Sequence, residues 1–523
     1  MLASLKIRCS EKFFWIAVTT ELVSPSISGA EARRAARNAG AIAAASILSR
    51  GLQFGWQLIL VPGLGPQAYG VYGAVAAFIM VGSSIPNFGM GPIFIRDIAR
   101  YPERAGKYLT STLFMQTVLG LLAYIGVNVA AALGGYNETV RVFLALAGIS
   151  LIIDILGNMC NDLLLAQERM VSTSIVAICH VVALVTFAAI GLATGYGLFG
   201  VYIGMILAGL GRSSVLWFLV LRNGTRPVWP FDRSIAFPLL LNGAPLALSA
   251  FLALAYQQAD KLVTSRLIGD AETGYLTAAF VIIFGVTELL NTTVLTAVYP
   301  MMSRAYGDGR SPMFGFIVNK LLFFNLLISF PIALTVSIFA DEMTIPLFGV
   351  KFQPTADVLR ILIWYALLSM TSAVLIRGLM VQNRQRGYVL IRAAGLVINI
   401  ALLFLLLPLI GVEGAALATC GAELVVLAIL FARFQTTGWD RREISLRILR
   451  LAVLGLFVVL AMMLLRGLHP ILGIVGGLLV YTAGIFIFIL AADDWDLLYR
   501  LVAVMPGGSF LLRYWRRDVK LNW

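Results

Sequence analysis

Polar and ionisable side chains recur at helical spacing inside the long apolar segments of this sequence. The first such segment carries four of them, in the order Ser46, Arg50, Gln53 and Gln57. Their intervals of three and four residues place them on one face of a helix. Glutamines, rather than a carboxylate, follow Arg50 on this face, and a guanidinium can bind a phosphate group through two parallel hydrogen bonds. We therefore predict that Arg50 binds a phosphate in a hydrated cavity.

Other apolar segments carry similar groups, and they divide into two sets of candidates. The candidate substrate-binding residues are Arg50, Gln53, Gln57, Arg377, Asn242 and Tyr256. The candidates for ion coupling or structural pairing are Asp154, Asp260, Lys261 and Glu288. A charge at the centre of a bilayer costs about 2.5–3.5 kcal/mol on insertion scales, so each one needs a reason. Hydrogen bonds and ion pairs between helices are an equally good reason for any single residue, and for the adjacent Asp260 and Lys261 we favour them.

The composition indicates that these side chains are held by helices that cross lipid. Of the 523 residues, 60% are hydrophobic and only 12% are charged, and the mean hydropathy is +0.91. Soluble domains carry about a quarter charged residues. Apolar runs of about 20 residues suit helices that span a bilayer, and the alternating pattern of a membrane β-barrel is missing. We predict an all-α integral membrane protein of about 14 transmembrane helices, among them 39–61, 70–94 and 274–302.

Three short motifs occur twice in the same order and at a nearly constant offset. The matched pairs are Leu64–Gly70 with Ile268–Gly274, Gln167–Arg169 with Gln382–Arg384, and Gly197–Gly200 with Gly411–Gly414. Such a pattern indicates an internal duplication. An even number of helices in each copy keeps both copies in one orientation, related by an axis along the membrane normal. We therefore predict two pseudo-symmetric six-helix lobes around a central cavity, followed by two further helices.

The predicted organisation has five parts. They are a cytoplasmic leader at 1–38, a first lobe at 39–225, a second lobe at 226–440, an extra helix pair at 441–492 and a basic cytoplasmic tail at 493–523. Arginine and lysine residues concentrate in the connections on the side of the two termini, and the positive-inside rule assigns that side to the cytoplasm. The same excess of basic residues on one side accounts for the formal net charge of +13, so we expect no nucleic-acid partner.

Sequence signatures of several other functions are missing. We find no Gly-x-x-x-x-Gly-Lys-Ser/Thr phosphate loop. The four cysteines and two histidines are scattered, without the spacing of a metal site or a disulfide framework. The connections on the outer side are short, which leaves no room for an external catalytic domain. We therefore expect no metal site, no cofactor and no enzymatic activity.

Several segments resemble one family of membrane carriers over about residues 35–440. The segments are Leu64–Tyr72, Gln257–Lys261, Leu267–Tyr275, Pro300–Arg304, Leu347–Gly349 and Gly411–Ala416. In order and spacing they resemble the polysaccharide-biosynthesis or O-antigen flippases. That family belongs to a superfamily that also holds multidrug exporters and the lipid II flippase.

The resemblance implies a function in polysaccharide synthesis. The chain would move polyprenyl-diphosphate-linked oligosaccharide repeat units across a bacterial inner membrane by alternating access, for exopolysaccharide, lipopolysaccharide O-antigen or capsule. It would work beside glycosyltransferases, a polysaccharide polymerase and export components. The resemblance also implies that Arg50, and with it Arg377, contacts the diphosphate.

Three alternatives remain open. An ion-coupled multidrug exporter of the same fold would carry acidic cavity residues for cationic drugs, whereas the first helix carries Arg50. A membrane glycosyltransferase or polysaccharide polymerase would need catalytic carboxylates in a long external loop, and the longest candidate, near 340–356, offers Asp341 and Glu342. A membrane scaffold without transport activity would not require an arginine inside a helix.

Overall fold

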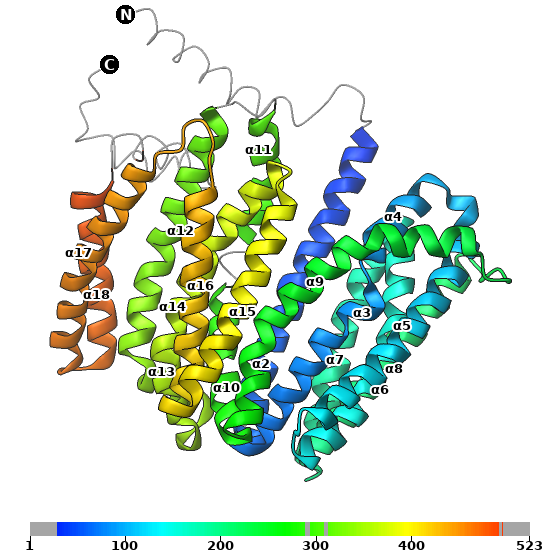
Figure 1. Cartoon of the computed structure of the whole chain (residues 1–523), viewed down its shortest axis with the longest axis horizontal. Helices are drawn as coiled ribbons and strands as arrows, with labels where there is room; N and C mark the ends of the chain where they lie inside the picture. The colour runs from blue at the N-terminus through cyan, green and yellow to red at the C-terminus, as the bar shows by residue number, and fades with distance from the viewer. Residues whose placement is uncertain (1–28, 288–292, 308–311, 491–493, 495–523) are drawn as a thin grey trace, which may run out of the picture. The chain divides into compact units, whose positions relative to one another are not determined.

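The computed structural model describes residues 29–287, 293–307, 312–490 and 494 (Figure 1). Within these ranges the chain is all-α and contains no β-strand. The helices of the first part are α2 Gly29–Gly82, α3 Ser84–Asn87, α4 Met90–Arg100, α5 Ala105–Leu133, α6 Glu138–Ala166, α7 Met170–Ala193 and α8 Gly197–Arg222.

The helices of the second part follow in the same manner. They are α9 Arg233–Leu267, α10 Asp270–Thr287, α11 Thr293–Tyr306, α12 Pro312–Ile338, α13 Ala340–Phe348, α14 Pro354–Val381, α15 Gln385–Ile410, α16 Val412–Arg433, α17 Arg441–Arg466 and α18 Pro470–Gly484. Short 3₁₀ turns at Pro102–Arg104 and Val350–Phe352 and a π turn at Ile485–Ile489 complete the described elements.

Twelve segments of the described chain are long and apolar enough to cross a membrane. The first, Ala44–Arg100, contains the helices predicted at 39–61 and 70–94. Its helical course is interrupted at Gly65, which has φ 72° and ψ 170°, a conformation open essentially to glycine alone. The helix predicted at 274–302 corresponds to α10 and α11, and the residues between these two lie outside the described ranges. The chain is therefore a multi-pass membrane protein.

The described residues form two compact units. The first lies within Met1–Ile59, Ile79–Leu133 and Arg141–Phe251, and the second within Leu60–Phe78, Gly134–Val140 and Leu252–Trp523. The second unit therefore includes part of α2. The lobe boundaries predicted from the sequence remain a prediction.

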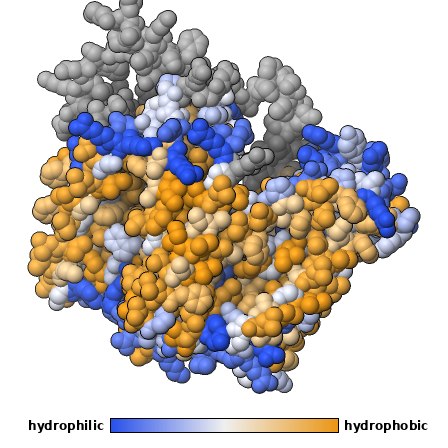
Figure 2. Space-filling model, viewed as in Figure 1, coloured by the Kyte–Doolittle hydropathy of each residue, from blue (hydrophilic) through white to orange (hydrophobic). Residues whose placement is uncertain are grey.

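Each unit has its own apolar interior. Leu109, Leu163 and Leu216 belong to a buried cluster in the first unit, and Phe314 and Phe434 to one in the second. Many large apolar side chains are nevertheless exposed, which suits contact with lipid. Figure 2 shows hydrophobic residues along the middle of the helices and hydrophilic residues toward their ends.

The two copies of one repeated motif end their helices with the same local geometry. Gln167–Arg169 follows α6 and Gln382–Arg384 follows α14. The middle residue is left-handed in both, with φ 58° at Glu168 and 57° at Asn383. In each copy the arginine N–H donates to the carbonyl five residues earlier, at 2.9 and 3.0 Å. These are the bonds of a Schellman cap, so the sequence match corresponds to a structural match.

Another repeated motif brings its two copies into contact inside the second unit. A Cβ at Gly70 would overlap the carbonyl oxygen of Asp270 and lie 2.9 Å from the backbone nitrogen of Gly274. A Cβ at Gly274 would lie 2.9 Å from the carbonyl carbon of Pro66 and 3.2 Å from the nitrogen of Gly70. The second half of α2 and the start of α10 therefore touch through their backbones, which only small residues allow. Matched positions of the duplication thus face one another.

The connection between α5 and α6 also packs within the second unit, against the ends of α9 and α10. The Tyr136 hydroxyl donates to a backbone carbonyl of α9 at 3.0 Å. The side-chain amide of Asn137 donates to the carboxylate of Asp270 at 2.5 Å. Burial, opposed by the charge of Arg266, raises the pKa of Tyr136 to about 12. This hydroxyl therefore keeps its proton at neutral pH and remains a hydrogen-bond donor.

Candidate functional site

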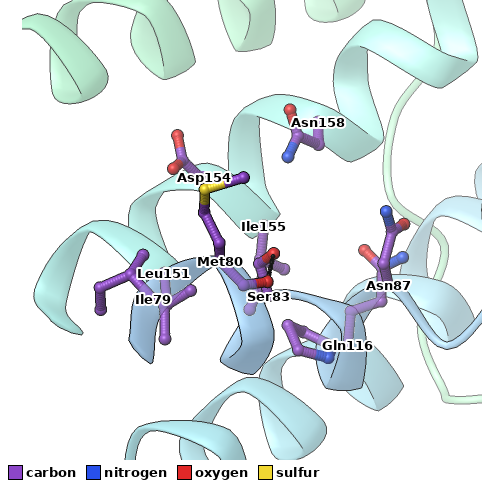
Figure 3. A pocket seen from close by; sticks show the side chains of 10 residues that line it. Ile79, Met80, Ser83, Asn87, Gln116, Leu151, Asp154, Ile155 and Asn158 are labelled. Carbon is purple, nitrogen blue, oxygen red and sulfur yellow. Dashed lines mark hydrogen bonds between the residues drawn. The ribbon is translucent and has the colours of Figure 1, made fainter. Parts of the chain in front are cut away.

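The first unit contains a cavity of about 290 Å³ (Figure 3). Its walls come from the end of α2, the single turn of α3, the middle of α5 and one face of α6. The lining residues are Ile79, Met80, Ser83, Pro86, Asn87, Gln116, Leu151, Asp154, Ile155 and Asn158. Five of the ten carry polar side chains, which is unusual for the interior of a membrane protein.

The chain interrupts its helical course beside this cavity. α3 is one turn long, and the left-handed residues Phe88 (φ 37°) and Gly89 (φ 66°) separate it from α4. A Cβ at Gly89 would lie 2.6 Å from the carbonyl oxygen of Gly243 in α9, so glycine permits this close approach. Irregular backbone at membrane depth is tolerated where it is buried in protein or lines a water-filled cavity. The broken segment is therefore suited to form a wall of a hydrated site.

α6 supplies the polar floor. Asp154 and Asn158 are four residues apart and share one helical face. Arg212 of α8 donates through Nη2 to Oδ1 of Asn158 at 2.6 Å, and its Nη1 lies 3.5 Å from Oδ1 of Asp154. The Arg212 side chain is 17% exposed and that of Asp154 45% exposed. Arg212 thus offsets the negative charge of Asp154 without lining the cavity, whereas Asp154 itself is part of the lining.

A second polar cluster lies in the second unit, at the meeting point of α9, α15 and α16. The Tyr256 hydroxyl donates to Oε2 of Glu423 at 2.8 Å. Arg392 lies 3.3 Å from the same oxygen and places its guanidinium carbon 4.9 Å from the centre of the Tyr256 ring. Glu423 is fully buried, and Arg392 is 16% exposed. This arrangement joins three helices by a buried ion pair that a hydroxyl completes.

Asp260 and Lys261 are buried in α9, about one helical turn after Tyr256. Nζ of Lys261 donates to Oε1 of Gln258 at 2.8 Å and lies 4.7 Å from the centre of the Phe280 ring. One oxygen of Asp260 accepts the backbone N–H of Lys261 at 2.8 Å, and the other, Oδ2, is buried without a hydrogen-bond partner in the described chain. The two charges are held by local contacts of α9 and α10.

The candidate substrate-binding residues are divided between the units. In the first unit Arg50, Gln53 and Asn242 are exposed and Gln57 is half-buried. In the second unit Tyr256 belongs to the buried cluster with Glu423, and Arg377 places its guanidinium 5.7 Å from the centre of the Tyr299 ring. Glu288 lies outside the described residues. The binding roles of these residues remain predictions.

Two charged residues at the centre of these sites were not among the sequence candidates. Arg212 and Glu423 each stand inside a long apolar helix, at a depth where an ionisable group needs a reason. That signal could have identified both. The amides Asn87 and Gln116 gave no such signal, because uncharged side chains cost less in lipid. No group of three or more His, Cys, Asp or Glu residues in the described chain is arranged to hold a metal ion.

Comparison with known proteins gives two family matches. The model described as polysaccharide biosynthesis protein matches residues 35–306, more than half of the chain, and the MatE model matches residues 245–405. No curated protein matches the chain.

Solved structures share the fold at low sequence identity. The lipid II flippase MurJ in an inward closed conformation has a TM-score of 0.71 and 16% identity, over 86% of this chain and 98% of that one. An inward-facing multidrug resistance transporter of the MATE family has a TM-score of 0.62 and 16% identity, over 76% and 94% of the two chains. An outward-facing structure from the same family gives a TM-score of 0.53 at 18% identity.

Proposed function

Because the chain belongs to the family of polysaccharide biosynthesis proteins, we propose that it is a flippase for lipid-linked oligosaccharides. Its cargo is an oligosaccharide repeat unit carried on a polyprenyl diphosphate, moved from the cytoplasmic to the periplasmic leaflet of a bacterial inner membrane. The observation that carries the proposal is the extent of the family match, which includes every residue that lines the polar cavity. The MurJ-like fold supports it.

The proposed mechanism is alternating access by two lobes, at 39–225 and 226–440, around a central cavity. A diphosphate headgroup needs cationic donors in a hydrated space, because an anion in hydrocarbon is strongly disfavoured. Arg50 is our proposed contact, with Arg377 as a second. An arginine fork suits this task because it donates two parallel hydrogen bonds to phosphate oxygens. The product would then pass to a polysaccharide polymerase and export components, with both termini of the chain in the cytoplasm.

Depletion of the protein tests this function directly. We expect lipid-linked repeat units to accumulate in the cytoplasmic leaflet. Extraction and mass spectrometry of the lipid fraction measure their amount. Treatment with an enzyme that modifies only outward-facing sugars shows in which leaflet they lie. Unchanged levels and sidedness of these lipids would contradict the proposal.

Substitution of Arg50 tests the headgroup contact. We expect Arg50→Ala to reduce flipping about tenfold to a hundredfold, the effect of losing charge-assisted hydrogen bonds. Arg50→Lys keeps the charge but loses the two parallel hydrogen bonds of the guanidinium, so its flipping rate should lie between those of the wild type and Arg50→Ala. Arg141→Ala, which removes an exposed arginine at the start of α6, is the matched control. Equal rates for wild type and both Arg50 variants would refute this role.

An ion-coupled multidrug exporter is the second candidate. The MatE match and the exposed carboxylate of Asp154 in the cavity favour it, since a carboxylate attracts cationic drugs. The same depletion strain separates the candidates. An exporter predicts increased sensitivity to cationic dyes and antibiotics with normal lipid-linked sugars, whereas a flippase predicts the lipid change.

A further inference from the structure

We propose that the cavity of the first unit binds one uncharged sugar ring of the cargo, an inference that rests on the proposed flippase function. The proposal assigns a separate site to the saccharide, apart from the arginine that we assign to the diphosphate. The size of the cavity, its hydrogen-bonding groups, its charge and its apolar wall all suit such a ring.

The size restricts the ligand to something small. Pockets for small molecules occupy about 300–1,000 Å³, and this cavity of about 290 Å³ stands at the lower limit. One monosaccharide unit suits such a volume, and a whole repeat unit exceeds it. The rest of an oligosaccharide would therefore extend beyond the cavity.

The hydrogen-bonding groups match hydroxyls. Asn87, Gln116 and Asn158 each offer an amide donor and an amide acceptor, and Ser83 adds a hydroxyl. Gln116 is only 6% exposed. In the part of the chain that the structure describes, the side-chain amides of Asn87 and Gln116 form no hydrogen bond with protein groups. Buried amides are normally satisfied, so the buried amide of Gln116 points to a polar ligand or to water that such a ligand displaces, and the exposed amide of Asn87 is open to the same ligand. Figure 3 shows their side chains at the same end of the cavity.

The charge of the lining excludes an anion. Asp154 is the charged residue that lines the cavity, and its carboxylate accepts hydrogen bonds from hydroxyls. Arg212 does not line it, and its guanidinium is already bound to Asn158 and close to Asp154. A phosphate would meet the carboxylate before any available cation. A neutral ring would meet a set of donors and acceptors instead.

The remaining lining suits the carbon face of a ring. Ile79, Met80, Leu151 and Ile155 form an aliphatic wall. A pyranose presents C–H groups on its faces and hydroxyls at its rim, so the wall and the amides together match its two kinds of surface. A ligand with hydroxyls alone and no apolar face would leave this wall in contact with water.

The proposal is tested by binding to the purified full-length protein in lipid nanodiscs. The probes are methyl glycosides released from the surface polysaccharide of the producing cells by methanolysis. Saturation-transfer NMR should detect at least one of them, and Gln116→Leu and Asn87→Leu should each weaken its binding about fivefold to tenfold. Asn128→Leu is the matched control, because it removes an amide from the same helix as Gln116 at a position outside the cavity lining. Equal thermal unfolding midpoints show that the variants are folded.

Other outcomes would overturn the proposal. They are no binding of any glycoside, equal binding by wild type and both cavity variants, or displacement of the glycoside by inorganic pyrophosphate. Binding of tetraphenylphosphonium that Asp154→Asn abolishes, without glycoside binding, would identify a site for organic cations. The depletion experiment distinguishes failure of the flippase function from failure of the sugar site. Normal lipid-linked sugars with glycoside binding refute the flippase, whereas accumulated lipids without glycoside binding refute only the cavity assignment.

Discussion

Gly70→Ala is expected to destabilise the protein severely, although it adds a single methyl group. The new Cβ would overlap the carbonyl oxygen of Asp270 and lie 2.6 Å from its carbonyl carbon, so the backbone of α2 or α10 must shift. Overpacking costs about 1–3 kcal/mol where side chains can move, and here the obstacle is backbone. We expect a thermal unfolding midpoint well below that of the wild type in detergent, and transport reduced at least in proportion to the folded fraction.

Gly55→Ala is the matched control for this prediction. Gly55 lies in the same helix, and a Cβ there would meet nothing within 4 Å. Alanine favours a helix over glycine by about 0.5–1 kcal/mol, so the control should unfold at the same temperature or slightly higher. Gly274→Ala should reproduce the loss, because its Cβ would lie 2.9 Å from the carbonyl carbon of Pro66. Indistinguishable midpoints for the substitutions at positions 55 and 70 would disprove the backbone contact.

Arg392→Met is the second change from which we expect a large effect. It leaves the fully buried carboxylate of Glu423 without its cation, while the Tyr256 hydroxyl still donates to it. Removal of one member of a buried ion pair costs about 3–5 kcal/mol, because the other charge stays desolvated. The expected result is a marked fall in the thermal unfolding midpoint of the purified protein.

The double variant Arg392→Met with Glu423→Leu provides the control. It removes both charges from the interior, and replacement of a buried pair by apolar residues is often neutral. We expect the double variant to regain most of the lost stability. If it is as unstable as the single variant, the ion pair is not the source of the loss.

The sequence predicted the fold well because lipid imposes length and composition on every spanning helix. It also predicted matching helix ends at the repeated motifs, since glycine and cap residues record backbone geometry directly, as at Glu168 and Asn383. It did not predict the break between α3 and α4, which was assigned to one helix at 70–94. Hydropathy shows only whether a segment is apolar. The segments on both sides of this break are apolar, so hydropathy does not reveal the break.

The candidate sites were harder to predict for a related reason. A membrane helix is apolar on its lipid face as well as its packed face, so helical periodicity does not reveal which side meets a neighbour. Asp154 was recognised by its charge, but its proximity to Arg212 depends on how α6 packs against α8. Tyr256 was likewise recognised without Glu423. Tertiary packing determines which residues far apart in the chain become interaction partners.

The glycine contact between α2 and α10 also bears on the origin of the molecule. If the two copies arose by duplication, a six-helix ancestor could have formed this contact only as a homodimer, in which one glycine met its own counterpart across a two-fold axis. Such an isologous interface must be self-complementary. Two copies joined in one chain are free of that requirement, so they can differ in sequence. Where the first copy has Pro66, the second has Asp270, whose carboxylate accepts a hydrogen bond from Asn137. An ancestral dimer could not have made that bond on one side alone.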